Sequence, residues 1–216
     1  MLRVVKREPA ALLLAAQLLG LLLYPFLTGS VGRPLFSALG LVLLGLVLLS
    51  VRSSPALTWI GVALAIPATV LLLIQAITDS DDLLPYSSAL EAVLYFYAAG
   101  ALIAYMLADR EITRDELFAV GATFTLVAWG FAYAYTVNQA IDPGSYTAAV
   151  NPDADRTWIE LLFLSFTTLS STGIGDVVPV KPFARSLVMV EQIAGVAYIA
   201  MVVSRLVGLL VMRDRE

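Results

Sequence analysis

A short segment in the last quarter of the chain has residue types and a spacing that suit coordination of a cation by backbone oxygen atoms. It reads Ser171-Thr172-Gly173-Ile174-Gly175-Asp176. Rings of backbone carbonyls can replace the hydration shell of an ion, provided that successive carbonyls point toward a common axis. Alternate residues must then adopt left-handed or otherwise unusual dihedral angles, which glycine does at little cost. Gly173 and Gly175, separated by one residue, fit this requirement, and Ser171 adds a hydroxyl group at the inner end.

The residues before this segment predict the element that positions it. From Thr157 to Ser170 the chain is apolar and rich in hydroxyl groups, yet it is shorter than the about 17–25 residues that cross a bilayer. Irregular backbone at membrane depth is tolerated only where it is buried in protein or lines a water-filled cavity. We therefore expect a re-entrant helix, capped by Asp153 or Asp155, with Glu160 in its first turn. Its C-terminal end carries partial negative charge and faces the loop.

Composition indicates an all-α membrane protein. The chain has 216 residues, of which 60% are hydrophobic, and its mean hydropathy is +0.87. Apolar runs long enough to span a bilayer predict six transmembrane helices, at residues 10–27, 34–51, 55–77, 87–108, 117–140 and 182–212. The chain contains no Cys and no His, which excludes disulfides, thiol chemistry and zinc sites built from these residues.

The spacing of these runs divides the chain into two predicted parts. Residues 1–109 contain four closely spaced helices, and residues 110–216 contain a helix, a long outer loop, the re-entrant element and a last helix. With the N-terminus inside, nine basic residues lie on the cytoplasmic side and four outside, which accounts for all 13. The positive-inside rule therefore predicts a multi-pass plasma-membrane protein with both termini in the cytoplasm. The outer loops then carry aspartates that enrich cations locally.

The loop resembles the signature of the potassium-channel superfamily, whose usual form is Thr-Val-Gly-Tyr-Gly-Asp. The resemblance covers roughly residues 110–216, because a hydroxyl-rich helix precedes the loop, Asp-x-x-Pro follows it and a spanning helix flanks it on each side. It implies a tetrameric pore in the lipid bilayer rather than an enzyme or a nucleic-acid-binding protein, since a single loop cannot surround an ion. It implies K+ as the permeant ion, with no other cofactor, and a selectivity filter made of the carbonyls of Ser171, Thr172, Gly173, Ile174 and Gly175. Alanine at either glycine is then expected to abolish conduction while assembly persists.

The resemblance also implies roles for residues around the filter. Asp176 matches the carboxylate at the outer mouth of such channels, and we expect it to bond behind the filter to Thr167 or Trp158. Gly195 stands where the inner helix of this family often bends, although a small residue for close helix packing is an equally good interpretation. One face of the last predicted helix is formed by Ile199, Val203 and Val207. Two interpretations fit this face: an apolar constriction that gates by dewetting, or ordinary helix packing.

Ser171 replaces the usual Thr and Thr172 replaces Val, and two further features depart from the usual channel. Ile174 replaces an aromatic residue that hydrogen-bonds or packs behind the filter, and isoleucine can only pack, so we expect a softer filter and less strict selectivity for potassium over sodium. The fourth predicted helix, residues 87–108, contains no Arg or Lys. A sensing charge contributes ~2.3 kcal/mol per 100 mV, so conventional voltage gating is not expected. Glu191 and Arg205, buried by position, are expected to face neighbouring helices or the cytosolic edge.

Parts of the sequence also fit functions other than a potassium channel. The first alternative is a weakly selective monovalent cation channel. Gly-x-Gly-Asp also occurs in intramembrane aspartyl proteases, but these need a second membrane aspartate to share a proton, and every other Asp here lies in a loop or at a chain end. Carriers of the potassium-transporter type join four such loops in one chain, whereas this chain has one. A non-conducting membrane scaffold leaves the filter-like loop unexplained.

Overall fold

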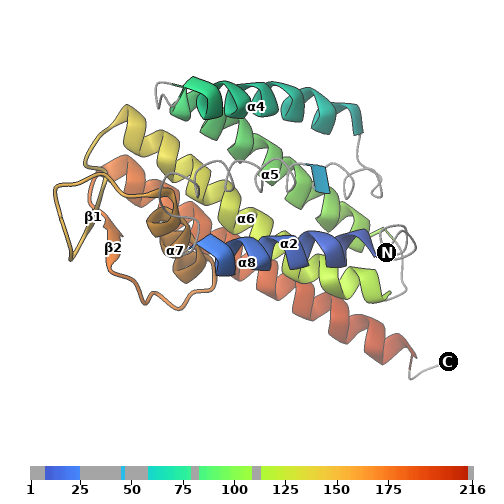
Figure 1. The fold of residues 1–216 in the computed structure, drawn as a ribbon. Helices are drawn as coiled ribbons and strands as arrows, with labels where there is room; N and C mark the ends of the chain where they lie inside the picture. The colour runs from blue at the N-terminus through green and yellow to red at the C-terminus, as the bar shows by residue number, and fades with distance from the viewer. Residues whose placement is uncertain (1–7, 25–44, 47–57, 79–82, 109–112, 214–216) are drawn as a thin grey trace. The chain divides into compact units, whose positions relative to one another are not determined.

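The computed structural model describes residues 8–24, 45–46, 58–78, 83–108 and 113–213 of the chain. Within these ranges the bounded elements are long helices and two short strands (Figure 1). In chain order they are α2 (Pro9–Leu23), α4 (Thr58–Thr78), α5 (Leu84–Met106), α6 (Arg114–Ile141), β1 (Tyr146–Ala148), α7 (Trp158–Leu169), β2 (Val177–Pro179) and α8 (Pro182–Arg213).

Four helices among the described residues are long and apolar enough to cross a membrane. They are α4, α5, α6 and α8, and each overlaps one of the six predicted spans. The predicted span 10–27 corresponds to α2, a shorter apolar helix of 15 residues, and the predicted span 34–51 lies almost wholly outside the described residues. The protein is therefore a mainly helical membrane protein, and the total of six crossings stays a prediction.

The chain forms two compact units, residues 1–127 and 128–216, and the boundary falls inside α6. The predicted division at residue 109 was drawn from the spacing of apolar runs, and it stays a prediction about domains. In the first unit the amide of Ala10, at the start of α2, donates a hydrogen bond to Asp115 Oδ1 (3.0 Å). Gln75 of α4 and Ser87 of α5 share a hydrogen bond of 2.9 Å. These contacts connect α2 to α6 and α4 to α5.

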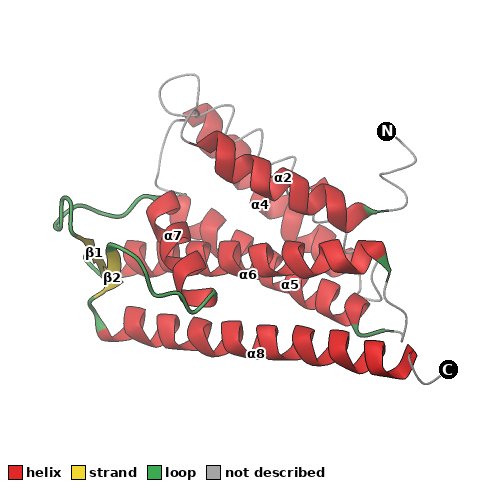
Figure 2. Ribbon diagram, turned by 90° about the horizontal axis from the view of Figure 1, so that it is seen from below, coloured by secondary structure: helices red, strands yellow, loops and turns green. Residues whose placement is uncertain are grey.

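The second unit contains the end of α6, the two strands, α7 and α8. The strands pair antiparallel, with Tyr146 opposite Pro179 and Ala148 opposite Val177. This pairing was not anticipated from the sequence. It fixes the chain on both sides of α7, because β1 belongs to the segment that leads into α7 and β2 follows the glycine-containing loop. Figure 2 shows the strand pair beside the beginning of α8.

The two faces of α8 differ in burial. The helix begins at Pro182, a residue favoured at the first helical position. A stripe repeating every three or four residues is buried within the chain, and it comprises Ala184, Val188, Glu191, Gly195 and Tyr198. The open face of α8 is apolar but exposed, and it comprises Met189, Ile193, Val196, Ile199 and Val203. An apolar patch of this length needs lipid or other protein against it.

Candidate pore loop

The start of α7 is fixed by its own capping residues. Thr157 is the N-cap and accepts a hydrogen bond from the amide of Glu160, while the Glu160 side chain accepts from the Thr157 amide at 2.7 Å. This capping box replaces the predicted cap by Asp153 or Asp155. Burial alone raises the pKa of the Glu160 carboxyl, but the Thr157 hydrogen bonds and the Arg156 charge outweigh burial and hold that pKa below its ordinary value.

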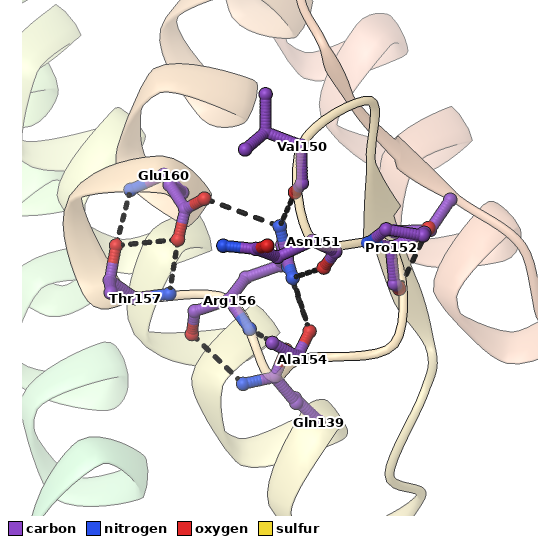
Figure 3. A network of polar contacts seen from close by, with 9 residues as sticks. Gln139, Val150, Asn151, Pro152, Ala154, Arg156, Thr157 and Glu160 are labelled. Atoms are coloured by element: carbon purple, nitrogen blue, oxygen red, sulfur yellow. Dashed lines mark hydrogen bonds and ion pairs between the residues drawn. The ribbon is translucent and has the colours of Figure 1, made fainter.

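Arg156 joins the start of α7 to the outer loop. Its guanidinium donates to the carbonyls of Val150 (3.3 Å), Asn151 (2.5 Å) and Ala154, and it pairs with Glu160 at 3.3 Å (Figure 3). Its side chain is nearly fully buried, so the bonds to carbonyls are needed to satisfy it. The sequence alone indicates Arg156 only as one of four outer positive charges.

The end of α6 also contacts Arg156, through Gln139. Gln139 accepts a hydrogen bond from the Arg156 amide (2.9 Å) and donates one to its carbonyl (3.0 Å) (Figure 3). A side-chain amide that pairs with both backbone groups of one residue acts as a short piece of strand ladder. The first turn of α7 is thereby held in a defined position against α6.

The middle of α7 contacts α6 and α8 through polar groups. Ser165 Oγ lies 2.8 Å from the Ala128 carbonyl and also within hydrogen-bond distance of Glu191 Oε1. The other carboxyl oxygen of Glu191 accepts a hydrogen bond from the Tyr135 hydroxyl. Glu191 has no exposed surface. This agrees with the expectation that Glu191 faces neighbouring helices, but its two partners were not foreseen.

The end of α7 lies against the backbone of α8. A Cβ atom added to Gly195 would stand 2.1 Å from the Leu169 carbonyl oxygen and 2.9 Å from its carbon. No side chain fits in such a gap, so the structure favours the close-packing interpretation of Gly195. The hinge interpretation concerns motion and stays a prediction.

The first residues of the predicted filter form the C-terminal cap of α7. Ser171 has a left-handed conformation (φ 59°), and its amide bonds to the Thr168 carbonyl at 3.0 Å. The Thr167 carbonyl accepts from both the Gly173 amide (3.0 Å) and the Thr172 hydroxyl (3.2 Å). Left-handed residues that return amides to the last turn are a common helix ending. The ending therefore explains why a residue other than glycine has positive φ here.

The two glycines of the loop differ in conformation. Gly173 has φ 65°, as expected for it, and a Cβ there would meet no atom within 4 Å. Gly175 is not among the described residues with positive φ. A Cβ on Gly175 would lie 3.5 Å from Thr167 Oγ1 and 3.7 Å from Phe163, which is ordinary contact. The alternating left-handed residues are therefore Ser171 and Gly173 rather than the two glycines.

The residues expected behind the filter occupy two separate places. Trp158 packs edge-on against Trp129, with ring centroids 5.2 Å apart, and also contacts Tyr133 at 5.4 Å. Thr167 lies beside Gly175 and donates its hydroxyl to the Leu164 carbonyl at 2.9 Å. Within the described part of this single chain, Asp176 is exposed and makes no hydrogen bond to either residue. Its bond behind the filter stays a prediction.

Residues 171–176 are all exposed in the single chain. Ile174 has 77% of its surface exposed, although it is apolar and follows the apolar helix α7. Among the described residues no group of three or more acidic side chains is placed to hold a metal ion. The oxygen atoms that this loop presents are those of its backbone, of the Ser171 and Thr172 hydroxyls and of the single Asp176 carboxylate.

Of the residues predicted to form a gate, Ile199 and Val203 lie on the open face of α8, with 44% and 53% exposure. The side chain of Val207 lies outside the described residues. The two described residues thus share a face, and the gate at this face stays a prediction.

A short helix between two spanning helices, followed by a glycine-containing loop, defines the pore module of a membrane channel. Residues 121–212 match the family model described as Ion channel, and this match supports a place for the chain in the potassium-channel superfamily. The match indicates an ion channel. No curated protein and no solved structure matches the chain. The matched segment begins in α6 and ends in α8, so it includes α7, the loop and the strand pair.

Proposed function

We propose that the chain forms a homotetrameric cation channel that conducts K+, with the carbonyls of residues 171–175 as the ion sites. The observation that carries the proposal is the exposed loop at the C-terminal end of α7, in which Ser171 and Gly173 have positive φ. The last carbonyls of a helix carry partial negative charge, which favours a cation at this end. The ion-channel family match over the same residues supports the assignment.

Four copies account for the exposed apolar surface. One loop forms one wall of a pore, and closed cyclic symmetry supplies the others. The open face of α8 and the side chain of Ile174 present apolar groups that are exposed among the described residues. Neighbouring subunits and lipid are the surroundings that this surface fits.

One residue of the loop, Ile174, bears on selectivity for potassium. Ile174 can pack against a neighbour but cannot hydrogen-bond, and here its side chain is free of contacts that would cover it. A filter without that support deforms more easily. A weakly selective monovalent cation channel is therefore the second candidate, and the same measurement separates the two.

We propose gating by a stimulus other than voltage. The described helix α5 contains Glu91 as its only charged residue, whereas voltage sensors need several basic residues. The positive-inside rule supports a plasma-membrane location with both termini in the cytoplasm.

Reconstituted protein should show cation current whose reversal potential follows the K+ gradient. Purified protein in planar bilayers would be measured under K+/Na+ and K+/Cl− gradients. A potential near the K+ equilibrium value supports the first candidate, and one that responds equally to K+ and Na+ supports the second. Anion current, or no current above that of protein-free bilayers, would refute both.

The purified protein should have the mass of four chains. Native mass spectrometry and graded crosslinking in mild detergent would give this number directly. A ladder ending at four bands is expected, because each chain supplies one pore loop. Monomers or dimers alone, under conditions in which current is retained, would contradict the tetramer.

A further inference from the structure

A buried polar cluster connects the three helices of the second unit behind the pore loop. It consists of the Tyr135 hydroxyl of α6, the Ser165 hydroxyl of α7, the Glu191 carboxyl of α8 and the Ala128 carbonyl of α6. Tyr135 and Ser165 are fully buried, as is Glu191. In the described part of the chain, no Lys or Arg forms an ion pair with Glu191.

The number of protons in this cluster limits the charge of Glu191. Three close contacts join its four groups, and each hydrogen bond needs one proton. Tyr135 and Ser165 carry one hydroxyl proton each, and the Ala128 carbonyl only accepts. An ionised carboxylate also only accepts. Two protons would then serve three contacts, and Ser165 would have to face either Ala128 or Glu191 with oxygen against oxygen.

A proton on Glu191 resolves the count. Tyr135 then donates to Glu191 Oε2, Glu191 Oε1 donates to the Ser165 hydroxyl, and Ser165 donates to the Ala128 carbonyl, which lies 2.8 Å away. We infer that Glu191 is held as a neutral carboxylic acid and that its proton fastens α7 to α8, which makes Glu191 a positioning residue for the pore loop.

The location of this fastening connects it to the filter. Ser165 meets Glu191, and one helical turn further along both helices Leu169 meets Gly195. The two contacts have the same offset in sequence, so α7 and α8 run side by side in the same direction here. Leu169 is the last residue of α7, and Ser171 follows it. The proton on Glu191 therefore acts on α7 six residues before Ser171, where the proposed ion sites begin.

An ionised Glu191 would be costly in this place. A buried charge without a partner of opposite sign is strongly unfavourable, and in a spanning helix it has no water to turn to. Tyr146 packs on Tyr135, with ring centroids 5.3 Å apart, and it adds a second phenol but no positive charge. The surroundings thus favour the neutral form that the proton count requires.

Infrared spectroscopy of the purified protein tests the protonation state without any need for conduction. A protonated carboxylic acid has a carbonyl stretch that an ionised carboxylate lacks. We expect Glu191→Gln to remove one such band from the wild-type spectrum near neutral pH. Glu91→Gln is the matched control, since Glu91 is also buried in a spanning helix, and it should leave that band in place. An unchanged band in Glu191→Gln would overturn the inference.

The positioning role rests on the proposed function and is tested by selectivity. Glutamine mimics the neutral acid, because its oxygen accepts from Tyr135 and its nitrogen donates to Ser165. Glu191→Gln should keep the K+/Na+ permeability ratio within about twofold of wild type, whereas Glu191→Leu should lower it at least about tenfold because it leaves Tyr135 unpaired. Failure of Glu191→Gln to assemble, or equal ratios in both variants, would refute the role. A band without any K+ current would refute the proposed function alone.

Discussion

Gly173→Ala is expected to lower K+ current at least about a hundredfold. Gly173 has φ 65°, and the left-handed region costs a residue with a Cβ roughly 1–2 kcal/mol. In a symmetric tetramer the cost recurs in every subunit, which gives roughly 4–8 kcal/mol for one pore. Each 1.4 kcal/mol is about a factor of ten, so the native loop would be a minor conformation. Its carbonyls would then no longer point toward a shared axis.

Two alanine variants control for this result. Gly144→Ala imposes the same strain at φ 74° in the outer loop, where a Cβ meets no atom, so it should lower stability by about 1 kcal/mol and preserve current. Gly175→Ala needs no left-handed residue and makes only ordinary contacts, so its loss of current should be smaller, which revises the sequence-based expectation that alanine at either glycine abolishes conduction. Wild-type current through Gly173→Ala, measured beside these controls with assembly verified, would refute the filter assignment.

The helices were largely predictable because their signals are local. A run of apolar residues of spanning length records the thickness of the bilayer, and α4, α5, α6 and α8 follow these runs closely. The short α7 was also predictable from a local signal, because its apolar stretch ends in a glycine-containing segment. Its first residue was placed too early, since three candidate caps lie within five residues and only Thr157 has Glu160 three positions later.

The contacts that position the loop could not be predicted in the same way. Ser165 bonds to a carbonyl 37 residues away, and Tyr135 bonds to a carboxyl 56 residues away. Such partners depend on how helices are placed side by side, which a single sequence does not record. One signal was available, namely a glutamate within an apolar span, which by itself suggests a functional site.

The sequence predicted one of the two left-handed residues of the loop, Gly173, but not the other, Ser171. Alternating unusual dihedrals were expected at the two glycines because glycine adopts them most readily. The structure instead uses Ser171, since the ending of α7 supplies hydrogen bonds that offset the strain of a left-handed serine. Residue type therefore gave the correct region, and the adjoining helix decided which residues in it take positive φ.

Gly195→Ala is expected to destabilise the assembled protein and to reduce current together. Its Cβ would stand 2.1 Å from the Leu169 carbonyl oxygen, so α8 must move away from the last turn of α7. Overpacking of this kind costs typically about 1–3 kcal/mol per subunit. Gly100→Ala is the matched control, because Gly100 is also helical but a Cβ there meets nothing within 4 Å. It should be neutral or stabilising by up to about 1 kcal/mol.

The same pair of variants distinguishes packing from bending at Gly195. If this glycine serves only as a hinge, alanine should alter opening and closing rates while the unfolding temperature and the K+/Na+ permeability ratio stay at their wild-type values. If it serves to bring α8 against Leu169, the unfolding temperature should fall in Gly195→Ala and not in Gly100→Ala. Permeability should change with it, because Ser171 begins the loop two residues after the displaced carbonyl. A wild-type unfolding temperature in Gly195→Ala would show that the close approach to Leu169 is not required, and the hinge interpretation would then be the one to pursue.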